Sequence, residues 1–198
     1  MNYDDILNSE LRRFKLDIAS ASRRLLADYA SEIEHWNKAV NLTALHGSLL
    51  VRRLLVEPAW VGQCLQMAGT LLDVGSGNGS PGIPLSLTRN FERVLLVEPR
   101  TRRAAFLRHV IGKLSLCHTE VARERIEAIP PGSIEPDWIT MQAIEPTEDI
   151  LACLNKLKSE TTRVVWITSK ENSPFSKAER IDVPGSTTKI WVFRLDQT

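Results

Sequence analysis

A glycine-rich segment that follows a short apolar run constrains the fold of this 198-residue chain more than any other feature. The apolar run at 71–74 leads into the sequence DVGSGNGSPG at 73–82, and the prolines after the run suit the first turn of a helix. Glycine allows a tight turn and lets the backbone approach a ligand without an intervening Cβ atom. Backbone amides at the start of a helix suit a carboxylate or a phosphate. A strand, a glycine loop and a helix in this order therefore predict a cofactor-binding unit.

The rest of the chain alternates between runs typical of strands and stripes typical of helices. Buried strands are predicted at 94–97, 137–141 and 163–168, with a last hairpin strand at 189–195. Apolar residues three or four positions apart predict helices over 22–40, 48–68, 102–116 and about 147–158. Strands that alternate with helices favour a mostly parallel, doubly wound sheet. We therefore expect an α/β protein in one compact unit, with an N-terminal helical extension over 1–68 and a Rossmann-like core over 69–198.

The composition is that of an ordinary globular protein, with 43% hydrophobic and 25% charged residues. No apolar stretch reaches the roughly 20 residues that a membrane span needs, and the N-terminus is too acidic for a secretory signal. The three cysteines lie far apart and have neither zinc-site nor disulfide-framework spacing. We therefore expect a cytoplasmic protein without a metal site. We expect a monomer, because no long exposed apolar seam is evident.

The acidic residue Glu98 ends the strand predicted after the glycine loop. In nucleotide-binding units of this kind, a carboxylate about 20 residues after the loop accepts both ribose hydroxyls. Three details favour S-adenosylmethionine over a dinucleotide. The glycine spacing is G-x-G-x-G, Asp73 supplies an acid that can balance the ammonium and sulfonium groups, and no phosphate-binding lysine follows the loop.

Several motifs, in order over nearly the whole chain, resemble the RsmG (GidB) family. The sequence WNKA at 36–39 followed by NLTA at 41–44 resembles the W-N-x-x-x-N-L-T segment of that family. The remaining motifs are GSGNGSPGIPLS at 75–86, LLVE at 95–98, Arg102-Arg103 with Phe106-Leu107, Arg125-Ile126-Glu127 followed by Asp137, and Val183-Pro184-Gly185.

The resemblance implies an S-adenosylmethionine-dependent methyltransferase that acts on N7 of a guanosine in small-subunit ribosomal RNA, free or in the 30S particle. It also implies a Rossmann-like methyltransferase fold with a mostly parallel, seven-stranded sheet. Glycines of the loop would hold the methionine portion, Glu98 the ribose, and the segment at 126–127 would lie near the adenine. The implied cofactor-binding residues are Asp73, Gly75, Ser76, Gly77, Gly79, Glu98, Pro99, Ile126 and Glu127.

The implied RNA-binding residues are mostly basic. Because the net charge is only +1, a surface that binds nucleic acid must be a local group of arginines. The residues expected to contact RNA are Asn41, Arg52, Arg53, Arg102, Arg103 and Gln142.

The chain departs from the family pattern mainly on the acceptor side. The family has S-R-A where this chain has Met141-Gln142-Ala143, so Gln142 replaces an arginine. The family sequence R-H-I-L-D-S is RRLLVE at 52–57 here, and the family pairs K-G and R-H are Lys170-Glu171 and Thr188-Lys189. These departures leave the catalytic residues unassigned. They also leave open a methyltransferase with another acceptor, or a non-catalytic, S-adenosylmethionine-binding protein associated with ribosomes.

Overall fold

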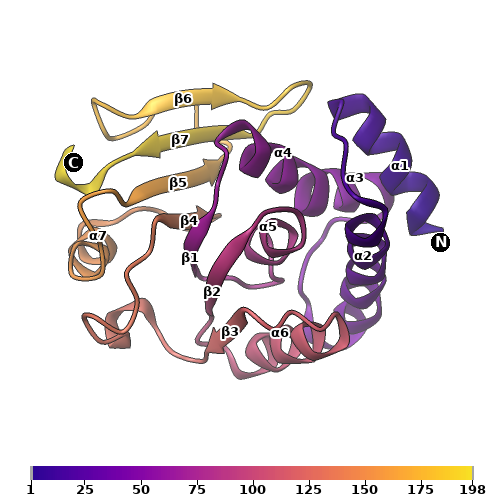
Figure 1. Cartoon of the computed structure of the whole chain (residues 1–198), viewed down its shortest axis with the longest axis horizontal. Coiled ribbons are helices and arrows are strands. Elements are labelled where there is room, and N and C mark those ends of the chain that lie inside the picture. Colours follow the sequence, from indigo (N-terminus) through magenta and orange to yellow (C-terminus); the bar gives the residue numbers. More distant parts are fainter. Residues whose placement is uncertain (1, 198) are drawn as a thin grey trace.

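The predicted strand at 71–74 is an interior strand of a seven-stranded sheet in the computed structural model, which describes residues 2–197. The strand order is β3-β2-β1-β4-β5-β7-β6. Strands β1 to β5 run parallel to one another, whereas β7 is antiparallel to both β5 and β6 at one edge (Figure 1). The strands are β1 (Gly69–Val74), β2 (Phe91–Val97), β3 (Thr119–Ala122), β4 (Trp138–Gln142), β5 (Arg163–Thr168), β6 (Glu179–Asp182) and β7 (Lys189–Phe193).

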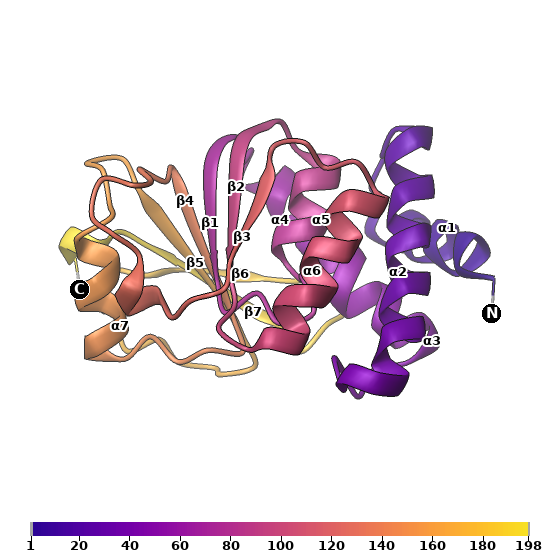
Figure 2. The same cartoon turned by 90° about the horizontal axis from the view of Figure 1, so that it is seen from below.

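Helices cover both faces of the sheet. Figure 2 shows α7 on one face and α4, α5 and α6 on the other, with α1 and α2 forming a further layer outside them. The helices are α1 (Tyr3–Phe14), α2 (Ser20–Val40), α3 (Gly47–Val51), α4 (Glu57–Cys64), α5 (Gly82–Thr88), α6 (Thr101–Lys113) and α7 (Glu148–Asn155). A π-helix, Arg52–Val56, joins α3 to α4, and short 3-10 turns lie at Ile126–Ala128 and Leu195–Gln197.

Two hydrophobic clusters form the core, one on each face of the sheet. The larger cluster joins the N-terminal helices to the sheet without a break, from Tyr3 and Tyr29 to Leu71 and Val192. The smaller cluster packs the other face against α7, with Leu154 and Trp166 completely or almost completely buried. The 1–68 extension and the sheet therefore share one core.

The sequence-based prediction missed three elements and simplified a fourth. Helix α1 and strands β3 and β6 were not predicted, because α1 carries many charges and the two strands are short and largely polar. The predicted helix over 48–68 spans 47–64 and contains the π-helix. Helices α6 and α7 end a few residues earlier than predicted. Among residues 2–197, no helix combines the length and the apolar character that a membrane crossing requires.

Candidate active site

An open cavity of about 440 Å³ lies at the carboxyl ends of β1, β2 and β4. Its volume is within the range of roughly 300–1,000 Å³ found for small-molecule sites. It also lies where the strand order reverses around β1, which is where ligands bind in open α/β sheets. The lining residues are Leu42, Leu54, Gly75, Ser76, Gly77, Asn78, Ser80, Glu98, Pro99, Arg100, Arg103, Gln142, Ala143 and Ile144.

The carboxylate of Glu98 is held against the glycine loop at one side of this cavity. The backbone amide of Gly77 donates to Glu98 Oε2 at 2.9 Å, and that of Arg100 donates to Oε1 at 2.8 Å. Gly77 has a φ of +54°, and a Cβ atom there would lie 3.5 Å from Arg103 Nη1. The absence of a side chain at Gly77 therefore keeps the space beside Glu98 open to a ligand.

Asp73 lies beneath the loop and does not line the cavity. Its carboxylate is 1% exposed and accepts a 2.7 Å hydrogen bond from Thr140 Oγ1, its register partner on β4. Burial raises the pKa of Asp73 to about 6, against the effect of this hydrogen bond. The buried acid thus supports the end of β1 from below, on the side away from the cavity lining.

The end of β4 and Arg103 also line the cavity, with Arg103 close to Gly77 and Glu98. Ser80 Oγ donates a 3.1 Å hydrogen bond to Gln142 Oε1, which joins the glycine loop to β4. Ile144 packs so closely on the loop that a Cβ atom at Gly75 would lie 1.9 Å from its Cδ1 atom. Arg103, on α6, donates to the backbone carbonyl of Asn41 at 3.4 Å. The cavity therefore has an uncharged amide and a guanidinium facing the space next to the loop.

Most of the predicted cofactor-binding residues are brought together, and the RNA-binding group is divided. Of the predicted residues, Gly75, Ser76, Gly77, Glu98, Pro99, Arg103 and Gln142 line the cavity. The others lie outside the lining: Asp73, Gly79, Ile126, Glu127, Asn41, Arg52, Arg53 and Arg102.

Arg52 and Arg53 make contacts within the protein. Arg52 forms two 2.8 Å hydrogen bonds with the buried carboxylate of Glu10 on α1. This contact raises the pKa of Arg52, although burial opposes the shift. Arg53 donates to the hydroxyls of Ser186 and Thr187 at 2.9 and 3.4 Å. Arg52 thus joins two parts of the helical extension, whereas Arg53 connects the extension to the segment before β7.

Three of the departures from the family pattern form one buried network. Thr188 Oγ1 donates to Glu57 Oε2 at 2.6 Å, and Arg53 Nε lies 3.9 Å from the same oxygen. Glu57 is 3% exposed, and its Oε1 atom has no hydrogen-bond partner within the described residues. Arg53, Glu57 and Thr188 therefore contact one another between the π-helix and β7, whereas Gln142 and the conservatively changed Leu54 line the cavity.

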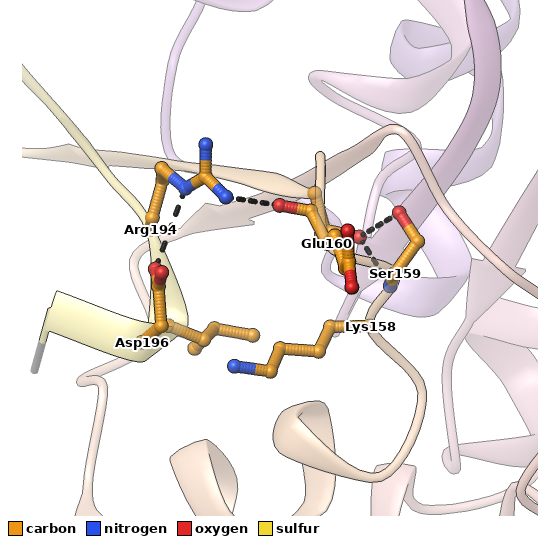
Figure 3. A pocket seen from close by; sticks show the side chains of 7 residues that line it. Lys158, Ser159, Glu160, Arg194 and Asp196 are labelled. Atoms are coloured by element: carbon orange, nitrogen blue, oxygen red, sulfur yellow. Dashed lines mark hydrogen bonds and ion pairs between the residues drawn. The ribbon is translucent and has the colours of Figure 1, made fainter.

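A second hollow, of about 410 Å³, lies by the start of β5 and the end of β7 (Figure 3). Arg194 contacts Asp196 at 3.4 Å and donates to the backbone carbonyl of Glu160. The Ser159 amide donates to the Thr162 hydroxyl at 2.8 Å. These polar groups bind one another, and none of them comes from the glycine loop. Among residues 2–197, no group of three or more His, Cys, Asp or Glu is arranged to hold a metal ion.

Residues 22–182 match the family GidB, described as rRNA small subunit methyltransferase G. The chain belongs to this family. Members of the family are S-adenosylmethionine-dependent methyltransferases of small-subunit ribosomal RNA, which agrees with the resemblance in the motifs at 36–44 and 75–86.

Two relatives with the name ribosomal RNA small subunit methyltransferase G illustrate how far the GidB similarity extends. The protein of Neisseria meningitidis serogroup C (strain 053442) is 29% identical over 199 residues, and the match covers 93% of this chain and 94% of the relative. The protein of Pseudomonas aeruginosa (strain LESB58) is 34% identical over 157 residues, covering 79% and 72%. The family similarity thus includes most of the helical extension as well as the sheet.

Solved structures confirm the Rossmann-like methyltransferase fold. A methyltransferase from Geobacter sulfurreducens superposes with a TM-score of 0.61 at 13% identity, over 84% of this chain and 88% of that one. At such low identity the similarity concerns the fold alone.

The prediction missed seven lining residues of the cavity. Asn78 and Ser80 lie within the recognised glycine loop, and Arg100 follows Glu98 and Pro99 closely. Ala143 and Ile144 follow a predicted strand, so the rule that ligands bind at the carboxyl ends of parallel strands could have indicated them. Leu42 and Leu54 come from the extension. Leu42 lies in the N-L-T motif, but the sequence carries no signal that would select Leu54 among its apolar neighbours.

Proposed function

We propose that this protein transfers the methyl group of S-adenosylmethionine to N7 of a guanosine in small-subunit ribosomal RNA. The observation that carries this proposal is the composition of one cavity. Its lining joins a glycine loop and the Glu98 carboxylate to Gln142 and the Arg103 guanidinium. The glycine loop and Glu98 suit the methyl donor, whereas Gln142 and Arg103 suit a polar, negatively charged acceptor.

The residues fit S-adenosylmethionine. A carboxylate has about four acceptor positions, so Glu98 keeps free lone pairs for ribose hydroxyls after it has bound two backbone amides. The backbone of Gly75 and Gly77 would approach the methionine portion, with Ser76 and Pro99 beside it. When bound, the cofactor supplies an electrophilic methyl group on a positively charged sulfur atom. Asp73 would contribute indirectly, by holding the end of β1 beneath the loop.

The acceptor atom explains why a cavity without an acid–base pair is sufficient. Guanine N7 carries a lone pair and no proton, so no residue has to act as a general base. Alignment of two bound reactants can contribute roughly 7–11 kcal/mol to lowering a barrier. Gln142, held by Ser80, would orient the base through a neutral hydrogen bond, and Arg103 would bind the RNA through its charge.

The proposal extends to the surroundings in which the protein acts. We infer that its acceptor is the 16S-type RNA of the small subunit, either free or in the assembled 30S particle, and that the protein acts as a cytoplasmic monomer. Exposed Arg102, next to Arg103 on α6, would add to the RNA contact. Ile126 and the exposed Glu127, in the turn after β3, would lie near the adenine.

The deciding experiment measures transfer of a labelled methyl group to small subunits and to naked small-subunit RNA that both lack the N7 mark. The proposal predicts label at one guanosine N7. Label in another RNA, or at another atom, would assign a different acceptor. A folded protein that binds S-adenosylmethionine and transfers label to no RNA would instead indicate a non-catalytic, ribosome-associated role.

A further inference from the structure

Helix α2 contacts both sides of the cavity, although it belongs to the extension and lies outside α5 and α6 (Figure 2). One contact comes from Tyr29 and the other from Asn37, eight residues later. Eight helical residues correspond to roughly 12 Å along the helix axis. The buried face of α2, which includes Leu26 and Ile33, packs into the larger hydrophobic cluster and fixes the helix in place.

Tyr29 holds the glycine loop from behind. Its hydroxyl donates a 2.7 Å hydrogen bond to the backbone carbonyl of Asn78, which lines the cavity. A Cβ atom at Gly79 would lie only 2.9 Å from the same hydroxyl oxygen, so the ring lies directly beneath the loop. Burial, and then the charge of Asp73, raises the pKa of Tyr29 well above its ordinary value. The hydroxyl therefore keeps its proton and remains a donor to the loop.

Asn37 folds the turn on the other side. Its Oδ1 atom accepts from the amides of Leu42 and Thr43 at 2.6 and 2.9 Å, and its Nδ2 atom donates to the Thr43 carbonyl at 2.8 Å. Leu42 is 5% exposed and lines the cavity. The preceding residue, Asn41, has a φ of +53° and presents its carbonyl to Arg103. The position of one cavity wall and of the Arg103 guanidinium thus depends on the side chain of Asn37.

We propose that α2 positions the two halves of the active site separately, with Tyr29 positioning the donor-binding loop and Asn37 positioning the acceptor-facing turn and Arg103. This inference rests on the proposed function for the identity of donor and acceptor. Tyr29 and Asn37 are positioning residues, because Tyr29 acts through Asn78 and Asn37 acts through Leu42 and Arg103. Because the hydroxyl of Tyr29 bonds directly to the loop and the side chain of Asn37 bonds directly to the turn at 42–43, substitutions at 29 and 37 should mainly alter different binding constants.

The first test compares Tyr29→Phe with Ser31→Ala. The Phe variant keeps the buried ring and removes the hydroxyl that binds the Asn78 carbonyl. Its Kd for S-adenosylmethionine, measured by calorimetry, should rise about five- to tenfold, as expected for the loss of one hydrogen bond. Its KM for RNA should stay within twofold. Ser31 also lies on α2, and its hydroxyl bonds to the Ala27 carbonyl of the same helix, so this control should leave both constants unchanged.

The second test uses two substitutions of graded severity at Asn37. Asn37→Ala removes all three hydrogen bonds to the 41–45 turn, whereas Asn37→Asp keeps the oxygen that accepts from Leu42 and Thr43. The KM for small-subunit RNA should rise about five- to tenfold for Ala and less for Asp, while the Kd for S-adenosylmethionine stays within twofold. The Asp variant keeps the test valid if the Ala variant does not fold.

Several outcomes would overturn the inference. An unchanged donor Kd in Tyr29→Phe would remove the role of Tyr29, and an unchanged RNA KM in both Asn37 variants would remove that of Asn37. Equal changes of both constants in either variant would indicate a general loss of structure. A wild-type protein that binds S-adenosylmethionine but methylates no RNA would refute the proposed function and the Asn37 half. The Tyr29 half would still be decided by calorimetry.

Discussion

Ser80 Oγ lies 3.1 Å from Gln142 Oε1, so the hydrogen bond between them ties the donor loop to the strand end that faces the acceptor. Gln142 is held in place by this contact and contributes an amide where the family has a guanidinium. It is the polar departure from the family pattern that lines the cavity, beside the conservative change at Leu54. The departures at 53, 57 and 188 contact each other elsewhere, so the polar character of the cavity differs from the family at Gln142.

Gln142→Arg should strengthen the interaction with small-subunit RNA. A charge-assisted hydrogen bond is about twice as strong as a neutral one, so we expect an increase of about fivefold in kcat/KM for RNA. Methyl transfer by the two proteins should be measured side by side on the same unmethylated RNA. Gln142→Met, which has a similar size and no charge, is the control and should show no increase. Equal rates for wild type and Gln142→Arg would contradict this explanation of the substitution.

Glu98→Gln should weaken binding of S-adenosylmethionine by about ten- to a hundredfold. The amide would lose the charge, and its nitrogen would face the backbone N–H of Gly77 or Arg100, donor against donor. Calorimetric titration of donor into each protein measures the effect. Glu92→Gln removes an exposed carboxylate from β2, the strand that Glu98 follows, and serves as the matched control. Donor affinity within twofold of wild type in Glu98→Gln would exclude the proposed ribose role.

The Asp73 carboxyl should make stability depend on pH. Burial raises its pKa from the ordinary value of 3.8 to about 6. The folded state therefore binds the proton more tightly than the unfolded state does, and stability from this group is greatest below pH 4 and is lost as the pH rises through 6. The pKa difference corresponds to about 3 kcal/mol.

Asp73→Asn removes this titration while keeping an oxygen for the bond from Thr140. Urea unfolding between pH 4 and pH 8 should show wild type losing about 3 kcal/mol relative to the Asn variant as the pH rises. All other titrating groups are common to both proteins, so they cancel in the difference. A difference in unfolding free energy that stays constant across this range would show that the buried acid has an ordinary pKa.

Thr188→Val should destabilise the protein by about 1–3 kcal/mol, because it removes the hydroxyl that satisfies the buried Glu57 carboxylate. The double variant Glu57→Met with Thr188→Val should recover part of this loss, since the buried carboxylate is removed together with its hydroxyl donor, although Ser186 and Arg53 each lose a partner. Denaturant unfolding of wild type, of each single variant and of the double variant gives the coupling free energy between Glu57 and Thr188. Thr187→Val, at an exposed neighbour whose hydroxyl makes one 3.4 Å contact with Arg53, should cost less than Thr188→Val. Additive losses in the double variant would show that the two side chains are not coupled.

The sequence predicted the central parts of the fold because their patterns are local and strong. The run at 71–74, the glycine loop and the acid at 98 form one βα unit whose order in the chain determines its geometry. Helices α2 and α6 were predicted from apolar residues at helical spacing. Helix α1 has the same kind of stripe, formed by Tyr3, Leu7, Leu11 and Phe14, but the charges between these residues obscured it.

The parts that escaped prediction depend on contacts between distant segments. Strand β6 is a polar edge strand that exists because β7 pairs with it, so its own residues carry no apolar pattern. The arginines at 52 and 53 resembled an RNA-binding pair, and only the fold brings Glu10 and Ser186 beside them. A linear sequence shows charge, but it does not show which charges are already bound within the protein.

The continuous core between the extension and the sheet has a consequence for how the chain folds during synthesis. The apolar faces of α1 and α2 emerge from the ribosome first, but residues that complete their cluster, such as Val183 and Val192, emerge last. We propose that the 1–68 and 69–198 segments acquire stable structure together and only near the end of translation. Nascent chains stalled before β7 should therefore remain sensitive to protease throughout α1 and α2.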